Sequence, residues 1–451
     1  MSRIALIGDN SIEYVKSLLE IWADGHSAVL LDWRIPPASA IEMMIEADVH
    51  CCYIEETFLH NFDVALCKDI SFKVFQNQTK STSILPKEIY DVFQADYRKD
   101  EAVVLYSSGT TGKSKGVILS HFAIQTNADA IIDYMNPTEG DCICIVKTLS
   151  HSSTLVGELL VALKTKTKLL IGPVITLPRV TMSNLSKFGV TILCANPTLL
   201  KMYADETKTK EYDLKTLRTI YVSGSILNDS IYEYAHRVFH GKQIYNVYGL
   251  SEAGPRVTAQ KKSCCQSNSV GTPIKGVQIA IVDDRGNLLS VGQRGSIHVK
   301  TLSLFDGYVK GTLKHTSKYM GWLNTGDIGY LDENRELHVI GRSDDVIIID
   351  AHKIYPQDIE EAIYKVSTIK ECVVTAIEQD NRPILCCAYV SETDLPVDIK
   401  KKLGEILLRY EIPKWFVKVD ELPKTRTGKT IVRSVQTMLK EVIENNEYDK
   451  K

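Results

Sequence analysis

Residues 106–116 read YSSGTTGKSKG and follow directly on the apolar run at 102–105. A strand that leads into a turn of glycines, small hydroxyl residues and lysines presents backbone N–H groups, hydroxyls and ammonium groups to one anion. A triphosphate is the anion that needs all three kinds of donor. The stretch therefore predicts a phosphate-binding loop at the end of a strand.

A second nucleotide-binding pattern lies close to the same residues. Positions 107–114, SSGTTGKS, differ from the Walker A loop G-x-x-x-x-G-K-[ST] only in that Ser107 stands where the first glycine should be. A P-loop ATPase would also need an apolar strand that ends in a magnesium-binding aspartate. This chain instead carries four further polar motifs in a fixed order, so a P-loop ATPase or kinase is kept only as an alternative.

Composition excludes several classes of protein. A chain of 451 residues with 44% hydrophobic residues can bury at least two cores, and its net charge of −3 makes neither nucleic acid nor an anionic membrane an expected partner. The chain has 11 cysteines without a C-x-x-C pair, which predicts reduced thiols and no zinc ribbon. No signal peptide and no run of transmembrane length are recognised, so we predict a cytoplasmic protein.

The order of apolar patterns predicts an α/β fold. Strand and helix patterns alternate over the first sixty residues and again from about His121, which is typical of parallel sheets. From about Val270 short strands and turns predict a small antiparallel or barrel-like unit, and from Asp344 onward a compact α+β unit follows. The alternation of lysine and threonine at 164–168 predicts the solvent face of a strand. We predict two domains, 1–343 and 344–451.

The four further motifs are NVYGLSEAGP at 246–255, NTGDIGYLD at 324–332, GRSDDVI at 341–347 and PKTRTGKTIVR at 423–433. Together with the loop, their order and spacing resemble the adenylate-forming superfamily of acyl- and aryl-CoA synthetases, nonribosomal-peptide adenylation domains and firefly luciferase. The resemblance covers nearly the whole chain. It implies that a carboxylate attacks the α-phosphate of ATP, that pyrophosphate leaves, and that the acyl group passes from AMP to a thiol.

The resemblance also implies roles for single residues. Thr110, Thr111 and Lys115, with Ser107 at the head of the loop, match the residues that hold the β- and γ-phosphates. Glu252 matches the acidic residue that binds Mg²⁺, and we count it as catalytic. Because two anions meet in the reaction, a metal and cations are required where they meet.

The match assigns the nucleoside end of ATP as well. Ser251 matches a hydroxyl residue that touches the α-phosphate, and Tyr248 matches an aromatic residue that stacks on adenine. Asp327 matches the carboxylate that accepts both ribose hydroxyls, with Arg342 beside it. The remaining residues of the predicted cofactor and substrate site are Gly224, Ser225, Asn246 and Gly249.

Two positions near the C-terminus complete the comparison. Lys429 matches the lysine that bridges the substrate carboxylate and the α-phosphate, and it is a predicted catalytic residue. Asp344 matches the hinge about which the small domain swings between two half-reactions. Residues 1–343 would then be the adenylation core that binds ATP and the acid, and 344–451 a mobile lid. Because Lys429, Glu252 and Asp327 are all present, an inactive nucleotide-binding regulator is a less favoured alternative.

The acid and the thiol are constrained only in part. His151 matches a residue that lines the acyl pocket, and we count it as catalytic, while Ser152 stands where amino-acid-activating domains carry an aspartate for the ammonium group. A fatty, branched or aryl acid is therefore favoured over an α-amino acid. The acceptor is CoA or the phosphopantetheine of a separate carrier protein. Ala351, which replaces the glycine usual beside the pantetheine arm, leaves open an enzyme that loads only a carrier protein.

Overall fold

Strands and helices alternate at the start of the chain, as the apolar pattern predicts. The computed structural model describes residues 1–62, 69–77, 81–107, 114–174, 176–261, 269–311, 318–349, 352–379, 382–392, 399–424 and 430–448. The Ser11 hydroxyl accepts a hydrogen bond from the Tyr14 N–H (3.0 Å) and so caps the first helix, and Gly25 follows its end at φ +75°. The first elements are β1 (Arg3–Gly8), α1 (Ile12–Ala23), β2 (Ser27–Asp32), α2 (Pro37–Glu46), β3 (Val49–Glu55) and α3 (Glu56–Leu59).

A seven-stranded sheet contains the first strands in the order β17-β7-β6-β2-β1-β3-β4. The five strands from β6 to β4 pair in parallel, which confirms the parallel sheet, while β7 and β17 add an antiparallel edge. Strands β1 and β2 are buried along nearly their whole length, as is typical of parallel strands that are covered on both faces of their sheet. The further strands are β4 (Ser71–Phe75), β6 (Glu101–Ser107), β7 (Lys115–Ser120) and β17 (Gly307–Tyr308).

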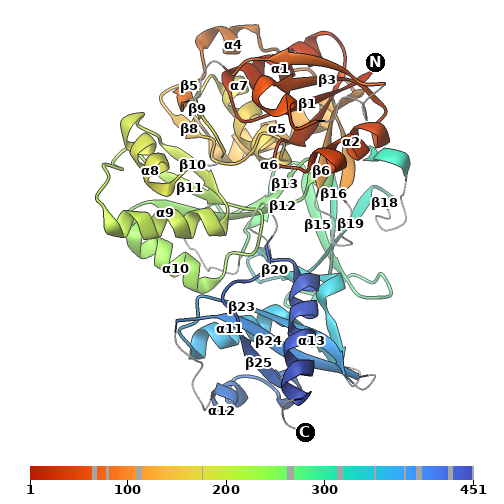
Figure 1. The fold of residues 1–451 in the computed structure, drawn as a ribbon, viewed down its shortest axis with the longest axis vertical. Helices are drawn as coiled ribbons and strands as arrows, with labels where there is room; N and C mark the ends of the chain where they lie inside the picture. Colours follow the sequence, from red (N-terminus) through yellow and green to blue (C-terminus); the bar gives the residue numbers. More distant parts are fainter. Residues whose placement is uncertain are drawn as a thin grey trace.

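An eight-stranded sheet forms the second half of the large unit, in the order β14-β13-β12-β11-β10-β8-β9-β5. Its centre, from β12 to β9, is parallel. Figure 1 shows α8 (Pro178–Lys187), α9 (Pro197–Thr209) and α10 (Asp229–Val238) gathered at its outer side. The strands are β5 (Ser83–Ile84), β8 (Cys142–Cys144), β9 (Lys168–Ile171), β10 (Ile192–Ala195), β11 (Thr219–Val222), β12 (Gln243–Gly249), β13 (Arg256–Ala259) and β14 (Thr272–Pro273).

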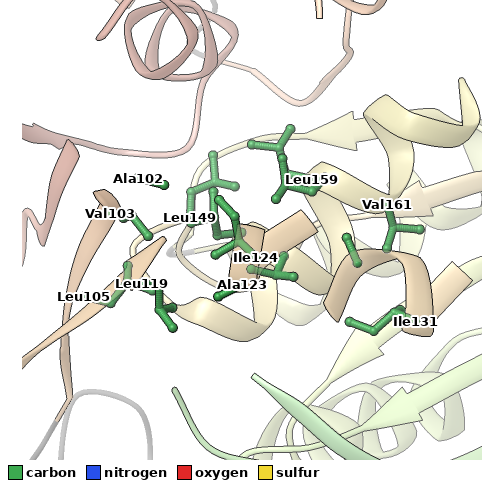
Figure 2. Packing of buried hydrophobic residues seen from close by; sticks show 14 of the residues in the cluster. Ala102, Val103, Leu105, Leu119, Ala123, Ile124, Ile131, Leu149, Leu159 and Val161 are labelled. Carbon is green, nitrogen blue, oxygen red and sulfur yellow. The ribbon is translucent and has the colours of Figure 1, made fainter. Parts of the chain in front are cut away.

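The main hydrophobic core is shared by the two sheets. Buried side chains from β6 and β7 meet those of α5 and of the helical run that follows Leu149, as Figure 2 shows. This run contains a π-helical segment, η2, which is a helix form often found at functional sites. The core therefore packs against strand β6, which ends at Ser107. The helices are α4 (Lys87–Val92), α5 (His121–Met135), α6 (Ser152–Thr154), η2 (Leu155–Leu160) and α7 (Val161–Thr165).

A five-stranded sheet follows, with β15-β16-β19-β18 in order and β20 paired to β19. All of its pairs are antiparallel, which confirms the change of architecture predicted from about Val270. Its turns are polar, and at the first of them Asp283 Oδ1 accepts N–H groups of Arg285 and Asn287. Its strands are β15 (Val277–Val282), β16 (Gly295–Thr301), β18 (Lys318–Tyr319), β19 (Trp322–Leu331) and β20 (Leu337–Arg342).

The C-terminal residues build a separate α+β unit, drawn in blue in Figure 1. It has its own two hydrophobic clusters, one on each face of the three-stranded sheet β23-β24-β25. Ion pairs Arg294–Asp358 and Lys353–Asp284 (2.6 Å) join it to the larger unit. The boundary at 343/344 stays a prediction. The elements are β21 (Ile347–Ile349), β22 (His352–Ile354), α11 (Pro356–Val366), β23 (Glu371–Gln379), β24 (Arg382–Val390), α12 (Ile399–Gly404), β25 (Trp415–Lys418) and α13 (Val432–Tyr448).

One local prediction was wrong. Residues 164 and 165 end helix α7, Lys166 is left-handed, and only Lys168 begins a strand. The pattern misled because Lys164 is held by tertiary contacts: its ammonium pairs with Asp129 (2.8 Å) and its side chain is only 8% exposed. The described cysteines are free thiols, all buried except the half-buried Cys51, as predicted. Among the described residues no helix combines the length and apolarity needed to cross a bilayer.

Candidate active site

The strand context of the predicted phosphate loop decides between the two nucleotide-binding patterns. Strands β6 and β7 pair in antiparallel register, with Ser107 opposite Lys115, so the loop joins two neighbouring strands. A Walker A loop joins a strand to a helix. The P-loop alternative is therefore rejected. Thr110 and Thr111 fall at 108–113, outside the described residues.

Lys115 and Glu252 are brought together by Tyr308, which the sequence analysis missed. The Tyr308 hydroxyl donates to Glu252 Oε1 (2.8 Å), and the Lys115 ammonium lies 5.5 Å from the centre of the Tyr308 ring. The Glu252 carbonyl accepts the N–H of Phe305 (2.9 Å), which anchors the same segment. Tyr308 lies outside the five motifs and gives no signal in the sequence.

The residues around Glu252 fit a magnesium ion that is held mainly by phosphate. The described residues contain no group of three or more histidine, cysteine or acidic side chains that could bind a metal. Mg²⁺ at ATP sites is usually held by one or two carboxylates with phosphate oxygens and water. The Glu252 carboxylate, joined through Tyr308 to Lys115 at the end of the predicted phosphate-binding loop, meets that requirement.

One hydrogen bond joins a serine next to the predicted acid-binding residue His151 to the serine predicted to touch the α-phosphate. Ser152 Oγ and Ser251 Oγ lie 2.9 Å apart, although 98 residues separate them in the chain, and half-buried His151 precedes the first of these serines. Asn10 holds the irregular segment before His151: its amide donates to the Lys147 carbonyl (2.8 Å) and accepts the Leu149 N–H (2.9 Å). Residues 147–152 thus lie against the YGLSE segment.

Three of the predicted nucleoside-binding residues are in contact. Asp327 and Arg342 stand opposite each other in the pair β19–β20, and Arg342 Nη1 donates to Asp327 Oδ1 (2.9 Å). The Tyr248 hydroxyl donates to Asp327 Oδ2 (2.5 Å), and Asp327 is only 7% exposed. Burial and the adjacent Asp327 carboxylate raise the pKa of Tyr248 well above its ordinary value, so it stays a donor.

Asp327→Asn should raise the KM for ATP about tenfold and lower the free energy of unfolding by about 1–2 kcal/mol. The amide keeps the shape of the side chain but removes the charge that Arg342 and Tyr248 face. Asp332→Asn is the matched control, because Asp332 accepts N–H groups of Asn334 and Glu336 (both 2.9 Å) in the hairpin turn after β19. ATP kinetics and thermal unfolding of both variants are the measurements. An unchanged KM for ATP in Asp327→Asn would contradict the ribose assignment.

The other predicted site residues lie near the carboxyl ends of β11 and β12. Those strands are parallel, so Gly224 and Ser225, exposed after β11, are at the same edge as Gly249 at the end of β12. A Cβ on Gly249 would lie 2.0 Å from the Pro255 carbonyl oxygen, so this position has no room for a side chain. Asn246 is 4% exposed and donates to the Ser269 carbonyl (3.2 Å), which is a contact inside the sheet.

Buried Asn127 of α5 is a second residue that the sequence analysis missed. Its side chain accepts the N–H of Arg256 (2.9 Å) and donates to the Arg256 carbonyl (2.9 Å) and to Ser303 Oγ (3.2 Å). These bonds fix the strand that leaves the YGLSEAGP segment. An asparagine within an ordinary helix carries no sequence signal for this role.

The remaining predictions concern the C-terminal motifs. Lys429 and Ala351 lie outside the described residues. Asp344 is exposed within the short 3₁₀ helix Ser343–Asp345, directly after the strand that carries Arg342. Its role as a hinge stays a prediction.

Comparisons with known proteins agree with this geometry. The family model "AMP-binding enzyme" matches residues 1–309, and "AMP-binding enzyme C-terminal domain" matches 358–429. A 4-coumarate–CoA ligase 2 of Nicotiana tabacum is 26% identical over 78% of this chain and 68% of its own. A long-chain-fatty-acid–CoA ligase of Bacillus subtilis (strain 168) is 29% identical over 80% of this chain and 65% of its own.

A solved structure shares the fold as well. The chimera of RpMatB and BxBclM bound to ATP superposes with a TM-score of 0.87 over 98% of this chain and 89% of its own, at 21% identity. The two family models cover the predicted phosphate loop, the YGLSE segment and residues 358–429 of the C-terminal unit. The chain belongs to the AMP-binding enzyme family of the adenylate-forming superfamily, and it is an AMP-forming acid–thiol ligase.

Proposed function

We propose that the chain converts a carboxylic acid without an α-ammonium group into its acyl-adenylate and transfers the acyl group to the thiol of CoA. The observation that carries this proposal is the hydrogen bond between Ser152 and Ser251. It joins the segment predicted to line the acid pocket to the hydroxyl predicted to touch the α-phosphate. A carboxylate bound beside His151 would therefore lie near the phosphorus atom that it attacks.

The described residues divide the work in a consistent way. Asp327, held by Arg342 and Tyr248, would bind the ribose hydroxyls and so fix the nucleoside. Lys115 would bind phosphate oxygens, and Glu252, oriented by Tyr308, would hold Mg²⁺. Bound there, magnesium neutralises charge on the triphosphate. Lys429 would neutralise the charge between the carboxylate and the α-phosphate.

CoA is the favoured acceptor because the relatives reported above are named CoA ligases. Loading of a carrier protein is the second candidate, on the ground that Ala351 replaces a glycine expected beside the pantetheine arm. The described cysteines are all free thiols, which suits a reducing compartment, and we propose the cytoplasm.

The test is exchange of labelled pyrophosphate into ATP, driven by a panel of fatty, aryl, dicarboxylic and amino acids. We expect exchange with one class of acid and no exchange with α-amino acids, because no carboxylate stands at Ser152 to pair with an ammonium group. Adding CoA or a phosphopantetheine-loaded carrier protein then identifies the acceptor by thioester formation. Release of ADP in place of AMP would contradict the proposal.

A further inference from the structure

Three charged side chains form a buried cluster in the wall behind the predicted acid site. We call Lys147, Glu158 and Arg256 the buried charge cluster. Glu158, in the π-helical segment η2, is 1% exposed and Arg256, at the start of β13, is 3% exposed. The Lys147 ammonium lies 3.0 Å from Glu158 Oε1. Arg256 reaches η2 as well, since its Nη2 would lie 3.4 Å from a Cβ on Gly157.

The cluster holds more positive than negative charge. Lys147 and Arg256 are two cations facing one carboxylate, and burial raises the pKa of Glu158, which reduces the negative charge further. The other titratable groups packed around it are neutral: burial raises the pKa of the Tyr134 hydroxyl and of the Cys194 thiol, each to about 12. The site is therefore short of at least one negative charge.

One nitrogen of the cluster also lacks a partner. Among the described residues, no hydrogen-bond partner is found for Arg256 Nε, although this atom is buried. A buried polar atom without a partner costs about 1–3 kcal/mol, and a buried unpaired charge costs more. An unpartnered guanidinium nitrogen in a cluster with excess positive charge indicates an anionic group that is supplied from outside the chain.

The position of the cluster connects it to the acid. Lys147 precedes His151 by one short turn, and Glu158 follows Ser152 on the same helical run. Arg256 follows directly on the YGLSEAGP segment, whose Ser251 bonds to Ser152. All three side chains thus come from the segments that would surround the acyl group.

We propose that the buried charge cluster binds a second carboxylate at the distal end of the substrate, so that the enzyme activates dicarboxylic acids. Arg256 would provide paired N–H donors to that carboxylate, Lys147 a point charge, and Glu158 would orient both cations. This inference rests on the proposed function and names its substrate class. An ω-amino acid held by Glu158 is the competing occupant, and the cationic excess disfavours it.

The experiment compares acids of matched length in the pyrophosphate exchange reaction: butanoate with succinate, hexanoate with adipate, and 6-aminohexanoate. We expect kcat/KM for the better diacid to exceed that of its monoacid by about 30-fold or more. Arg256→Met should lower kcat/KM for the diacid by about 30-fold and leave that for the monoacid unchanged or higher, with Arg256→Lys in between. Arg218→Met is the matched control, because Arg218 pairs with Asp141 (3.0 Å) outside this wall.

Folding and turnover are separated from specificity by two further measurements. The Arg256 main-chain bonds to Asn127 do not depend on its side chain, and thermal unfolding checks that Arg256→Met and Lys147→Met are folded. Calorimetric binding of the diacid in the presence of α,β-methylene-ATP needs no chemistry. If no acid drives exchange, the proposed function fails, and diacid binding lost in Arg256→Met would still support the inference. A higher kcat/KM for the monoacid or for 6-aminohexanoate than for the diacid would overturn the inference. So would an equal loss of kcat/KM for the diacid and its monoacid in Arg256→Met.

Discussion

Replacing Lys429 by alanine is expected to lower the rate of adenylate formation by about 10²–10³-fold, with a small effect on ATP binding. A cation aimed at charge that develops between a carboxylate and a phosphate acts mainly in the transition state, so kcat should fall more than KM rises. The two ends of its motif that the structure describes are tied together, since Lys424 and Thr430 form a β-bridge and the Ile431 N–H bonds to the Pro423 carbonyl (2.8 Å). Acid-dependent pyrophosphate exchange is the measurement.

The control for this variant lies in the same motif. Lys424→Ala removes a lysine whose ammonium pairs with Glu371 (2.7 Å) on β23, inside the C-terminal unit. Exchange should survive this change nearly intact. Equal losses in the two variants would mean that the motif supports the fold of the lid, and the catalytic assignment of Lys429 would have to be abandoned.

Gly249→Ala is expected to reduce exchange activity by at least about 100-fold. The new methyl carbon would lie 2.0 Å from the Pro255 carbonyl oxygen, which already accepts the Leu250 N–H (2.9 Å), so the backbone must move. That movement would displace Tyr248 and Ser251, which flank the glycine closely in the chain. A shift of about 1 Å in positioning residues can cost about 10²-fold in rate.

The matched control is another glycine with room for a methyl group. A Cβ on Gly140 would meet only Thr138 Oγ1, at 3.6 Å, and its backbone is not left-handed. Gly140→Ala should therefore keep both activity and thermal stability. Full activity in Gly249→Ala would show that this close approach can relax without cost to the site, against the geometry described here.

Most helices and strands could be predicted from the sequence, because their formation depends on residues that are close in the chain. Short apolar runs became buried strands of two largely parallel sheets, as the alternation of strand and helix patterns predicted. The run at 164–168 failed because the contact of Lys164 with Asp129, 35 residues away, outweighs any local alternation. A pattern cannot represent a partner that is distant in the chain.

The residues of the candidate site also fall into two groups, those that the sequence predicted and those that only the structure revealed. Five motifs predict Glu252, Asp327 and Lys115 as site residues without a structure, through their resemblance to the adenylate-forming superfamily. Tyr308, which bonds to Glu252, and Asn127, which bonds to the Arg256 main chain, give no such signal, since a buried tyrosine or asparagine looks the same in any core.

The sequence by itself determined the family and the order of the elements, and it predicted the residues of the phosphate and ribose sites, because these are properties of short contiguous stretches. Only the tertiary structure decided that the loop joins two antiparallel strands, which rejects the Walker interpretation. Only the fold, too, brought Lys147, Glu158 and Arg256 into one buried cluster. Charge balance in a low-dielectric interior is set by neighbours in space, and the chain order does not record them.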